Sequence, residues 1–174
     1  MSKALLFASL IFCSTAFGDL SVTVVTSPGD SRIPAVNDAV AFWNHQLDRL
    51  GVQTRLKPAE LVERRRDLRD VPGNIVIVLT HGDFASFTRT SEDGERSVIA
   101  IRRGDDEPLS NANVARNVIA HEIGHALGLE HNSDRTMLMC GRPAPCRPDM
   151  FASDKVVIFP LTLRERATLR RRLK

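Results

Sequence analysis

The chain has 174 residues, a formal net charge of +3 at pH 7 and a sequence pI of about 9.1. Tyrosine is absent, and no aromatic residue lies within the arginine clusters at 64–66 and 170–172. These features give base stacking little support, and we expect no nucleic-acid partner. Solvated helix faces explain such clusters more often than contact with an anionic surface does.

Residues 1–18 have the pattern of a cleaved export signal. An early lysine precedes an apolar run at 4–12, and Ala16 and Gly18 are small residues at the positions that a signal peptidase requires. The apolar run is too short to span a bilayer, and no later segment is long enough. We therefore expect a secreted or periplasmic monomer with no membrane span, in which residues 19–174 form one domain with a sizeable core.

After the signal, the chain opens with a strand, a helix and a second strand. Residues 20–26 alternate and are rich in β-branched side chains, which predicts the first strand. Apolar residues at helical spacing predict a helix from Pro34 to about Leu50, where Gly51 ends it. The second strand is predicted at 52–56. This order predicts parallel pairing of the strands.

The middle of the chain completes the predicted sheet. Residues 58–69 predict a short charged helix or an irregular segment. An unbroken apolar run within 74–80 predicts the most buried strand. Two shorter strands are predicted at 84–90 and 98–102, joined by the turn-forming residues 91–94. The expected sheet is twisted and mostly parallel.

Two further helices follow. The first has a cap at Ser110 or Asn111 and is predicted to run to Leu127, with one apolar face. The second closes the chain at 161–173, and Thr162 is a suitable residue for its cap.

Residues 121–131 read His-Glu-Ile-Gly-His-Ala-Leu-Gly-Leu-Glu-His. His121 and His125 are four residues apart, so on a helix both imidazoles can reach one ion. A continued helix would carry His131 to another face, but Gly128 can end the helix because glycine readily adopts the left-handed conformation. Three neutral histidines leave a coordination position open for water, which is typical of a catalytic zinc site.

Glu122 lies beside that open position, where its carboxylate can take a proton from water. The alternative is a buried helix with two satisfied histidines and a helix-ending glycine. A match to His-Glu-x-x-His alone would leave that alternative open, because five-residue patterns recur by chance. The additional requirement for Gly128 and His131 makes a chance match rare.

The stretch resembles the zinc-binding consensus of the metzincin metalloproteases without a mismatch, and it is most similar to the matrixin branch. The resemblance implies an α+β, zincin-like fold. In such a fold, a twisted mixed sheet of about five strands, with one antiparallel edge strand, packs on two long helices and is followed by a C-terminal helix. It also implies a tight Met-turn at 136–140, in which Met139 packs beneath the zinc ligands, with Met137 as the less favoured alternative. Residues 84–90 would form the cleft-edge strand.

The chain departs from the matrixin pattern at several positions. Asn132 follows the third histidine, and Cys140 stands where matrixins usually have tyrosine. The loop at His81 resembles the start of the structural-zinc loop of matrixins but lacks further ligands, which predicts one zinc per chain. Residues 105–107 resemble an acidic calcium site, although a solvated acidic turn is the more frequent explanation.

Two cysteines remain once the signal is removed. Cys140 and Cys146 have five residues between them, in a proline-rich loop of a chain expected to be exported, and this predicts a disulfide. The rival is a thiolate ligand to zinc, which is disfavoured because three histidines already complete the site.

These observations predict a secreted zinc endopeptidase of metzincin type. Glu122 would act as the general base on the attacking water. A protein or peptide substrate would lie extended along the edge strand. The alternative is a non-catalytic exported binding protein with a structural zinc, which would have no need of a base beside the metal.

Overall fold

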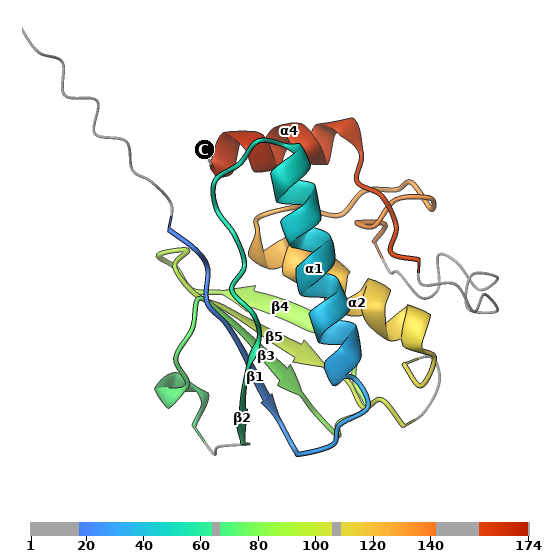
Figure 1. Ribbon diagram of the computed structural model, residues 1–174. Coiled ribbons are helices and arrows are strands. Elements are labelled where there is room, and N and C mark those ends of the chain that lie inside the picture. The colour runs from blue at the N-terminus through green and yellow to red at the C-terminus, as the bar shows by residue number, and fades with distance from the viewer. Residues whose placement is uncertain (1–17, 64–66, 106–108, 142–156, 174) are drawn as a thin grey trace, which may run out of the picture.

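The computed structural model describes residues 18–63, 67–105, 109–141 and 157–173. Its core is a five-stranded sheet with the order β2-β1-β3-β5-β4, covered on one face by helices α1 and α2 (Figure 1). The strands are β1 (Val22–Thr26), β2 (Glu60–Glu63), β3 (Ile75–Leu79), β4 (Phe87–Thr90) and β5 (Ser97–Ile101). No helix within the described ranges is both long and apolar enough to cross a membrane.

The sheet is mixed. Strands β2, β1, β3 and β5 run parallel to one another, whereas β4 pairs antiparallel with β5 at the edge. This confirms the predicted α+β fold with one antiparallel edge strand. The predicted strand at 84–90 is shorter in the structure, where only Phe87–Thr90 pairs with β5.

The central strands are the ones whose side chains are buried on both faces of the sheet. Every residue of β3 is buried, as its unbroken apolar sequence predicts, and every residue of β1 is buried as well. In β5 the residues alternate between buried and half-buried positions. The side chains of one face meet the helices, and those of the other form a smaller cluster that includes Val71, Val76 and Val78.

Helices α1 (Ile33–Arg49) and α2 (Ala112–Ala126) pack against each other over the sheet. The Asn111 side chain caps α2 by accepting hydrogen bonds from the first backbone amides of the helix. Trp43 of α1 is fully buried, and its indole Nε1 donates a 2.9 Å hydrogen bond to the carbonyl oxygen of Ala120 in α2. This contact joins α1 to α2 at the residue before His121, and so helps to position the histidines of α2.

The predicted second strand at 52–56 is wrong. Val52, Thr54 and Leu56 are buried in alternation, but the segment makes only one isolated bridge, from Leu56 to Leu20. Both polar backbone groups of Leu56 are bound by one side chain, because Asn44 of α1 donates to its carbonyl oxygen and accepts from its amide. The strand beside β1 is instead β2, within the segment expected to be helical or irregular.

Another departure concerns the rest of that charged segment. After β2, residues Leu68–Asp70 form a 3-10 helix, η1, whose cap is Asp67. Three arginines between the two elements, 64–66, lie outside the described residues. The segment is therefore a sheet edge followed by a single tight turn, rather than one helix.

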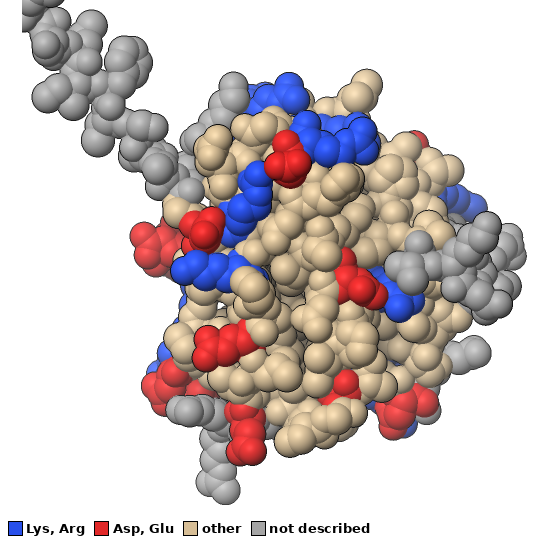
Figure 2. Space-filling model, viewed as in Figure 1, with Lys and Arg blue, Asp and Glu red and all other residues tan. Residues whose placement is uncertain are grey.

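The C-terminal helix α4 (Leu163–Arg172) crosses the end of α1 (Figure 1). A capping box begins it, because the Thr162 side chain accepts from the Glu165 amide and the Glu165 side chain accepts from the Thr162 amide. Its arginines form a basic rim at the top of the face in Figure 2, while acidic side chains lie mainly toward the bottom and left edges.

Candidate metal centre

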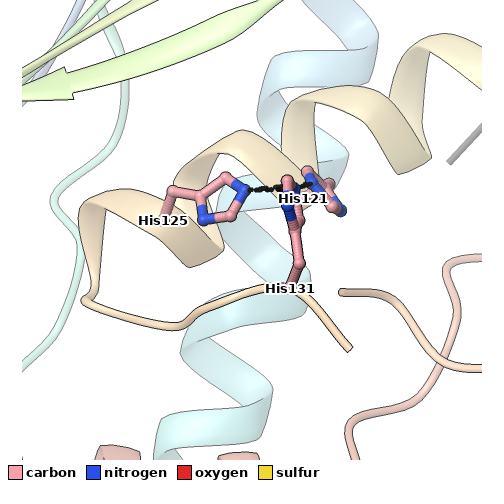
Figure 3. Close-up of side chains that lie close together, drawn as sticks. All are labelled: His121, His125 and His131. Atoms are coloured by element: carbon pink, nitrogen blue, oxygen red, sulfur yellow. Dashed lines mark hydrogen bonds between the residues drawn. The ribbon is translucent and has the colours of Figure 1, made fainter. Parts of the chain in front are cut away.

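Three histidine rings converge at one point of the molecule (Figure 3). His121 and His125 project from the last turns of α2, and His131 reaches the same point from the loop that follows. The Nε2 atom of His121 lies 3.1 Å from that of His125 and 3.1 Å from that of His131, and the third pair is 3.0 Å apart. The sequence motif therefore becomes a compact three-nitrogen site.

The other ring nitrogens of the two helical histidines are held by backbone carbonyls. His121 Nδ1 lies 2.9 Å from the carbonyl oxygen of Leu138, and His125 Nδ1 lies 2.8 Å from that of Leu129. A carbonyl oxygen only accepts, so each Nδ1 must carry the proton and each Nε2 must present a lone pair. This is the tautomer that a metal ligand needs.

The spacing of these nitrogens fits a bound zinc. The lone pairs of His121 Nε2 and His125 Nε2, which face each other at 3.1 Å, repel one another, and a central cation removes that repulsion. A tetrahedral zinc with Zn–N bonds of about 2.0–2.1 Å would hold its nitrogens about 3.3 Å apart, so the site needs only a slight expansion. Within the described part of the chain, these histidines are the one group of three or more candidate ligands.

Gly128 redirects the chain after α2. Its φ is +84°, the left-handed conformation that favours glycine, and its amide donates to the carbonyl oxygen of His125 at 2.9 Å. The next amide, of Leu129, donates back to Gly124 at 2.9 Å. The helix therefore ends where the sequence predicts, and the chain returns beneath the site with His131.

Met139 lies under the histidine pair in a tight turn. The amide of Cys140 donates to the carbonyl oxygen of Met137 at 3.3 Å, which closes the turn. Met139 is fully buried, and its Sδ packs on Gly124, where an added Cβ would come within 2.5 Å of it. Met137 is only half-buried. The geometry thus gives Met139 the packing position and explains why a glycine separates the two helical ligands.

Glu122 is buried beside the three rings, and its Oε2 accepts a 2.7 Å hydrogen bond from the Thr88 hydroxyl of β4. The same hydroxyl lies 3.0 Å from the Glu122 carbonyl oxygen, so it can donate to either acceptor. Burial raises the pKa of the Glu122 carboxyl, and the Thr88 hydrogen bond and the charge of His131 offset part of that rise. A bound dication would lower this pKa further.

The pKa of His131 is shifted in the direction that suits a ligand. Partial burial lowers it, the positive charge of His125 lowers it further, and the Glu122 carboxylate opposes both effects. A lower pKa favours the neutral imidazole, which is the form that binds metal.

Several sequence predictions fall partly outside the described residues. Cys140 is buried at the end of the Met-turn, but Cys146 lies outside the described residues, so their disulfide stays a prediction. The expected calcium site at 105–107 gains no support, because its second and third residues lie outside and the Asp105 carboxylate accepts a 2.9 Å hydrogen bond from Arg103. Most of the expected export signal, residues 1–17, also lies outside.

Sequence reasoning missed three contacts of the site. Thr88 carries no recognisable signal, since it is one of several threonines in a short strand. The carbonyl of Leu138 could not be anticipated either. Glu165 offers a weak signal as the fourth residue of a Thr-x-x-Glu capping pattern, and its carboxylate accepts a 2.6 Å hydrogen bond from Asn132, the residue after the third histidine.

Comparisons with known proteins identify a family from the sequence and a fold from the structure. The family model described as Matrixin matches residues 36–152. No curated protein sequence gives a significant match. The archaemetzincin from Methanopyrus kandleri aligns with a TM-score of 0.51 and 16% identity, over 94% of this chain and 99% of its own. A chain from a chaperone–substrate complex aligns with a TM-score of 0.52 and 11% identity, over 89% of this chain but 34% of its own.

At these identities, the structural likeness concerns the fold alone, and it matches the zincin-like arrangement expected from the sequence. The family match covers most of the chain, from α1 through the three histidines and the Met-turn. The chain therefore belongs to the matrixin family of zinc metallopeptidases, within the metzincins.

Proposed function

We propose that this chain is an exported zinc endopeptidase in which Glu122 acts as the general base. One observation carries the proposal: a buried carboxylate stands beside three converging histidine nitrogens and is oriented by a hydroxyl of the edge strand. A structural metal site has no need of such a group.

Zinc bound at the three histidines would polarise the scissile carbonyl and lower the pKa of the attacking water. Thr88 occupies Glu122 Oε2, which leaves Oε1 to accept a proton from the water as its oxygen bonds to the carbonyl carbon. When the carbon–nitrogen bond breaks, Glu122 passes that proton to the leaving nitrogen. The chain has no tyrosine, so backbone donors would have to assist the developing oxyanion.

We infer that the substrate is a protein or peptide bound in an extended form along β4. Strand β4 is last in the sheet order, so its outer backbone edge has no partner strand among the described residues. Through Thr88, the same strand touches the proposed base. Main-chain hydrogen bonds to this edge would form with almost any substrate sequence, and side-chain pockets would determine which residues are preferred.

The compartment and assembly belong to the same proposal. The pattern of residues 1–18 supports export to the periplasm or the medium. In that environment, Cys140 and Cys146 would form a disulfide directly after the Met-turn. We propose that the exported protein acts as a monomer with one zinc.

The proposed activity is tested with casein or a quenched peptide library. The purified protein should cleave these substrates, lose the activity in a zinc chelator and regain it when zinc is added back. Metal analysis of the same sample should give one zinc per chain. A protein that holds one zinc and cleaves nothing would instead favour the alternative, an exported binding protein with a structural zinc.

Thr88 offers a test of how the base is oriented. Thr88→Val removes the hydrogen bond to Glu122 Oε2 and should lower kcat for peptide cleavage about tenfold or more, because a hydrogen bond to a charged group contributes about 1.5–3 kcal/mol. KM should change little. Thr88→Ser keeps the hydroxyl and should recover most of the lost rate. If valine and serine behave alike, the hydroxyl does not orient the base.

A further inference from the structure

The C-terminal segment, 157–173, is joined to α2 and to the Met-turn by hydrogen bonds. The amide of Leu138, whose carbonyl holds His121, donates a 2.8 Å hydrogen bond to the carbonyl oxygen of Pro160. Asn117 of α2 donates to the carbonyl oxygen of Val157 at 2.6 Å. The family match ends at residue 152, so these contacts come from a part of the chain beyond the matched segment.

Glu165 of α4 binds the residue that directly follows the third histidine. Its carboxylate is buried, with Oε1 accepting from Asn132 Nδ2 at 2.6 Å and Oε2 accepting from the amide of Thr162 at 2.7 Å. Asn132 directly follows His131, and its own amide donates to the carbonyl oxygen of Met139 at 2.8 Å. The residue after the third histidine is therefore held by α4 through its side chain and by the Met-turn through its backbone.

A second contact from α4 reaches the other end of the same loop. The guanidinium of Arg172 packs on Gly128, so closely that a side chain at position 128 would overlap it. The loop that carries His131 thus meets α4 at both ends, at Gly128 and at Asn132.

His131 depends on this loop more than the other two histidines depend on theirs. His121 and His125 are fixed by helical backbone and by a carbonyl on Nδ1, whereas no carbonyl holds Nδ1 of His131 within the described part of the chain. His131 is also the exposed member of the three. The described contacts that hold it in place are those of the backbone beside it, at Asn132.

We propose that Glu165 is a positioning residue for the third metal ligand, and that it acts through Asn132 to hold His131 against the other two histidines. Helix α4 then contributes to zinc affinity without supplying a ligand. Outer contacts of this kind typically change metal affinity by about 10–100-fold. The inference rests on the three-histidine site and is measured without a substrate, so its failure would leave the test of peptide cleavage intact.

The test measures zinc affinity of the full chain by competition with a chromophoric chelator. Glu165→Gln has nearly the same shape, but its amide has one acceptor oxygen and cannot accept from both Asn132 and Thr162. We expect about tenfold weaker zinc binding. Asn132→Asp should weaken binding as well, because it sets two carboxylates against each other.

The double variant N132D/E165Q provides the rescue. The new glutamine amide can donate to the new aspartate carboxylate, while its oxygen still accepts from the Thr162 amide. Both hydrogen bonds are then restored, and only the one between positions 132 and 165 has its direction reversed. Zinc affinity should recover to within about threefold of the wild type. Two weak single variants and an equally weak double variant would overturn the proposal.

Thr162→Ala separates positioning from helix stability. It removes the side-chain half of the capping box but keeps the backbone amide that Glu165 accepts from. The melting temperature of the zinc-free protein should fall, while zinc affinity stays within about twofold. If Thr162→Ala weakens zinc as much as Glu165→Gln does, or if Glu165→Gln lowers only the melting temperature, Glu165 supports the helix and not the ligand.

Discussion

Replacing Glu122 with glutamine should abolish peptide cleavage while leaving zinc in place. Glutamine keeps the shape of the side chain, and its oxygen can still accept the hydrogen bond from Thr88, but it cannot take a proton from water. A positioned general base typically contributes about 10²–10⁴-fold to the rate, so kcat should fall by that factor. The cleavage rate of a quenched peptide and the zinc content of the same sample measure both parts of this result.

The matched control is Glu130→Gln. Glu130 belongs to the same histidine motif but is exposed, and it should tolerate the change without loss of rate or zinc. If Glu122→Gln kept activity within tenfold of the wild type, another group would have to act as the base. If the two variants lost activity equally, the cause would be the loss of a negative charge in the motif and not the loss of proton transfer.

Much of the fold could be predicted because its signals are local. The apolar run of β3, the apolar stripe of α1 and the Asn111 and Thr162 caps each act within a few residues, and the structure contains all of them. The alternation of buried and more exposed residues at 52–56 predicted a strand that does not form. The alternation is present there, but an extended segment joins a sheet only where a partner backbone is available. At Leu56 the Asn44 side chain binds the backbone groups instead.

The candidate site likewise has one part that the sequence predicts and another part that it does not. The spacing of the histidines and the left-handed Gly128 follow from helix geometry, so the sequence predicts that three ligands meet. Contacts made by Thr88 and Glu165 join residues more than thirty positions apart, and no periodicity encodes them. They depend on how β4 and α4 pack around α2, which only the tertiary structure provides.

A buried ion pair joins the start of α1 to the ends of two strands. Arg32 and Asp30 have side chains that are 3% and 7% exposed, and they pair at 2.6 Å. The guanidinium also donates to the carbonyl oxygens of Thr80 at 3.0 Å and of Ile101 at 3.4 Å. Thr80 directly follows β3 and Ile101 is the last residue of β5, so one arginine anchors the turn after β1 to the sheet.

Asp30→Asn should therefore destabilise the protein strongly at neutral pH. It leaves the Arg32 charge buried without a counter-charge, and breaking a buried pair in this way costs about 3–5 kcal/mol. Urea unfolding of the zinc-free protein at pH 7 measures the loss. Asp67→Asn is the control, because Asp67 and Arg69 have the same spacing and pair at 2.7 Å, but with side chains that are 41% and 90% exposed. Its urea midpoint should barely move.

The difference between wild type and Asp30→Asn should also depend on pH. Burial alone would raise the pKa of Asp30, but the hydrogen bonds and charge of Arg32 outweigh it and hold the pKa below its ordinary value of 3.8. Because the folded pKa is the lower one, the stabilisation is complete above pH 3.8 and is lost as the pH falls through the folded value. The difference in unfolding free energy should stay constant from pH 7 to about 5 and shrink in stronger acid. A difference that grows with acid would show that the carboxylate of Asp30 is not the charge that balances Arg32.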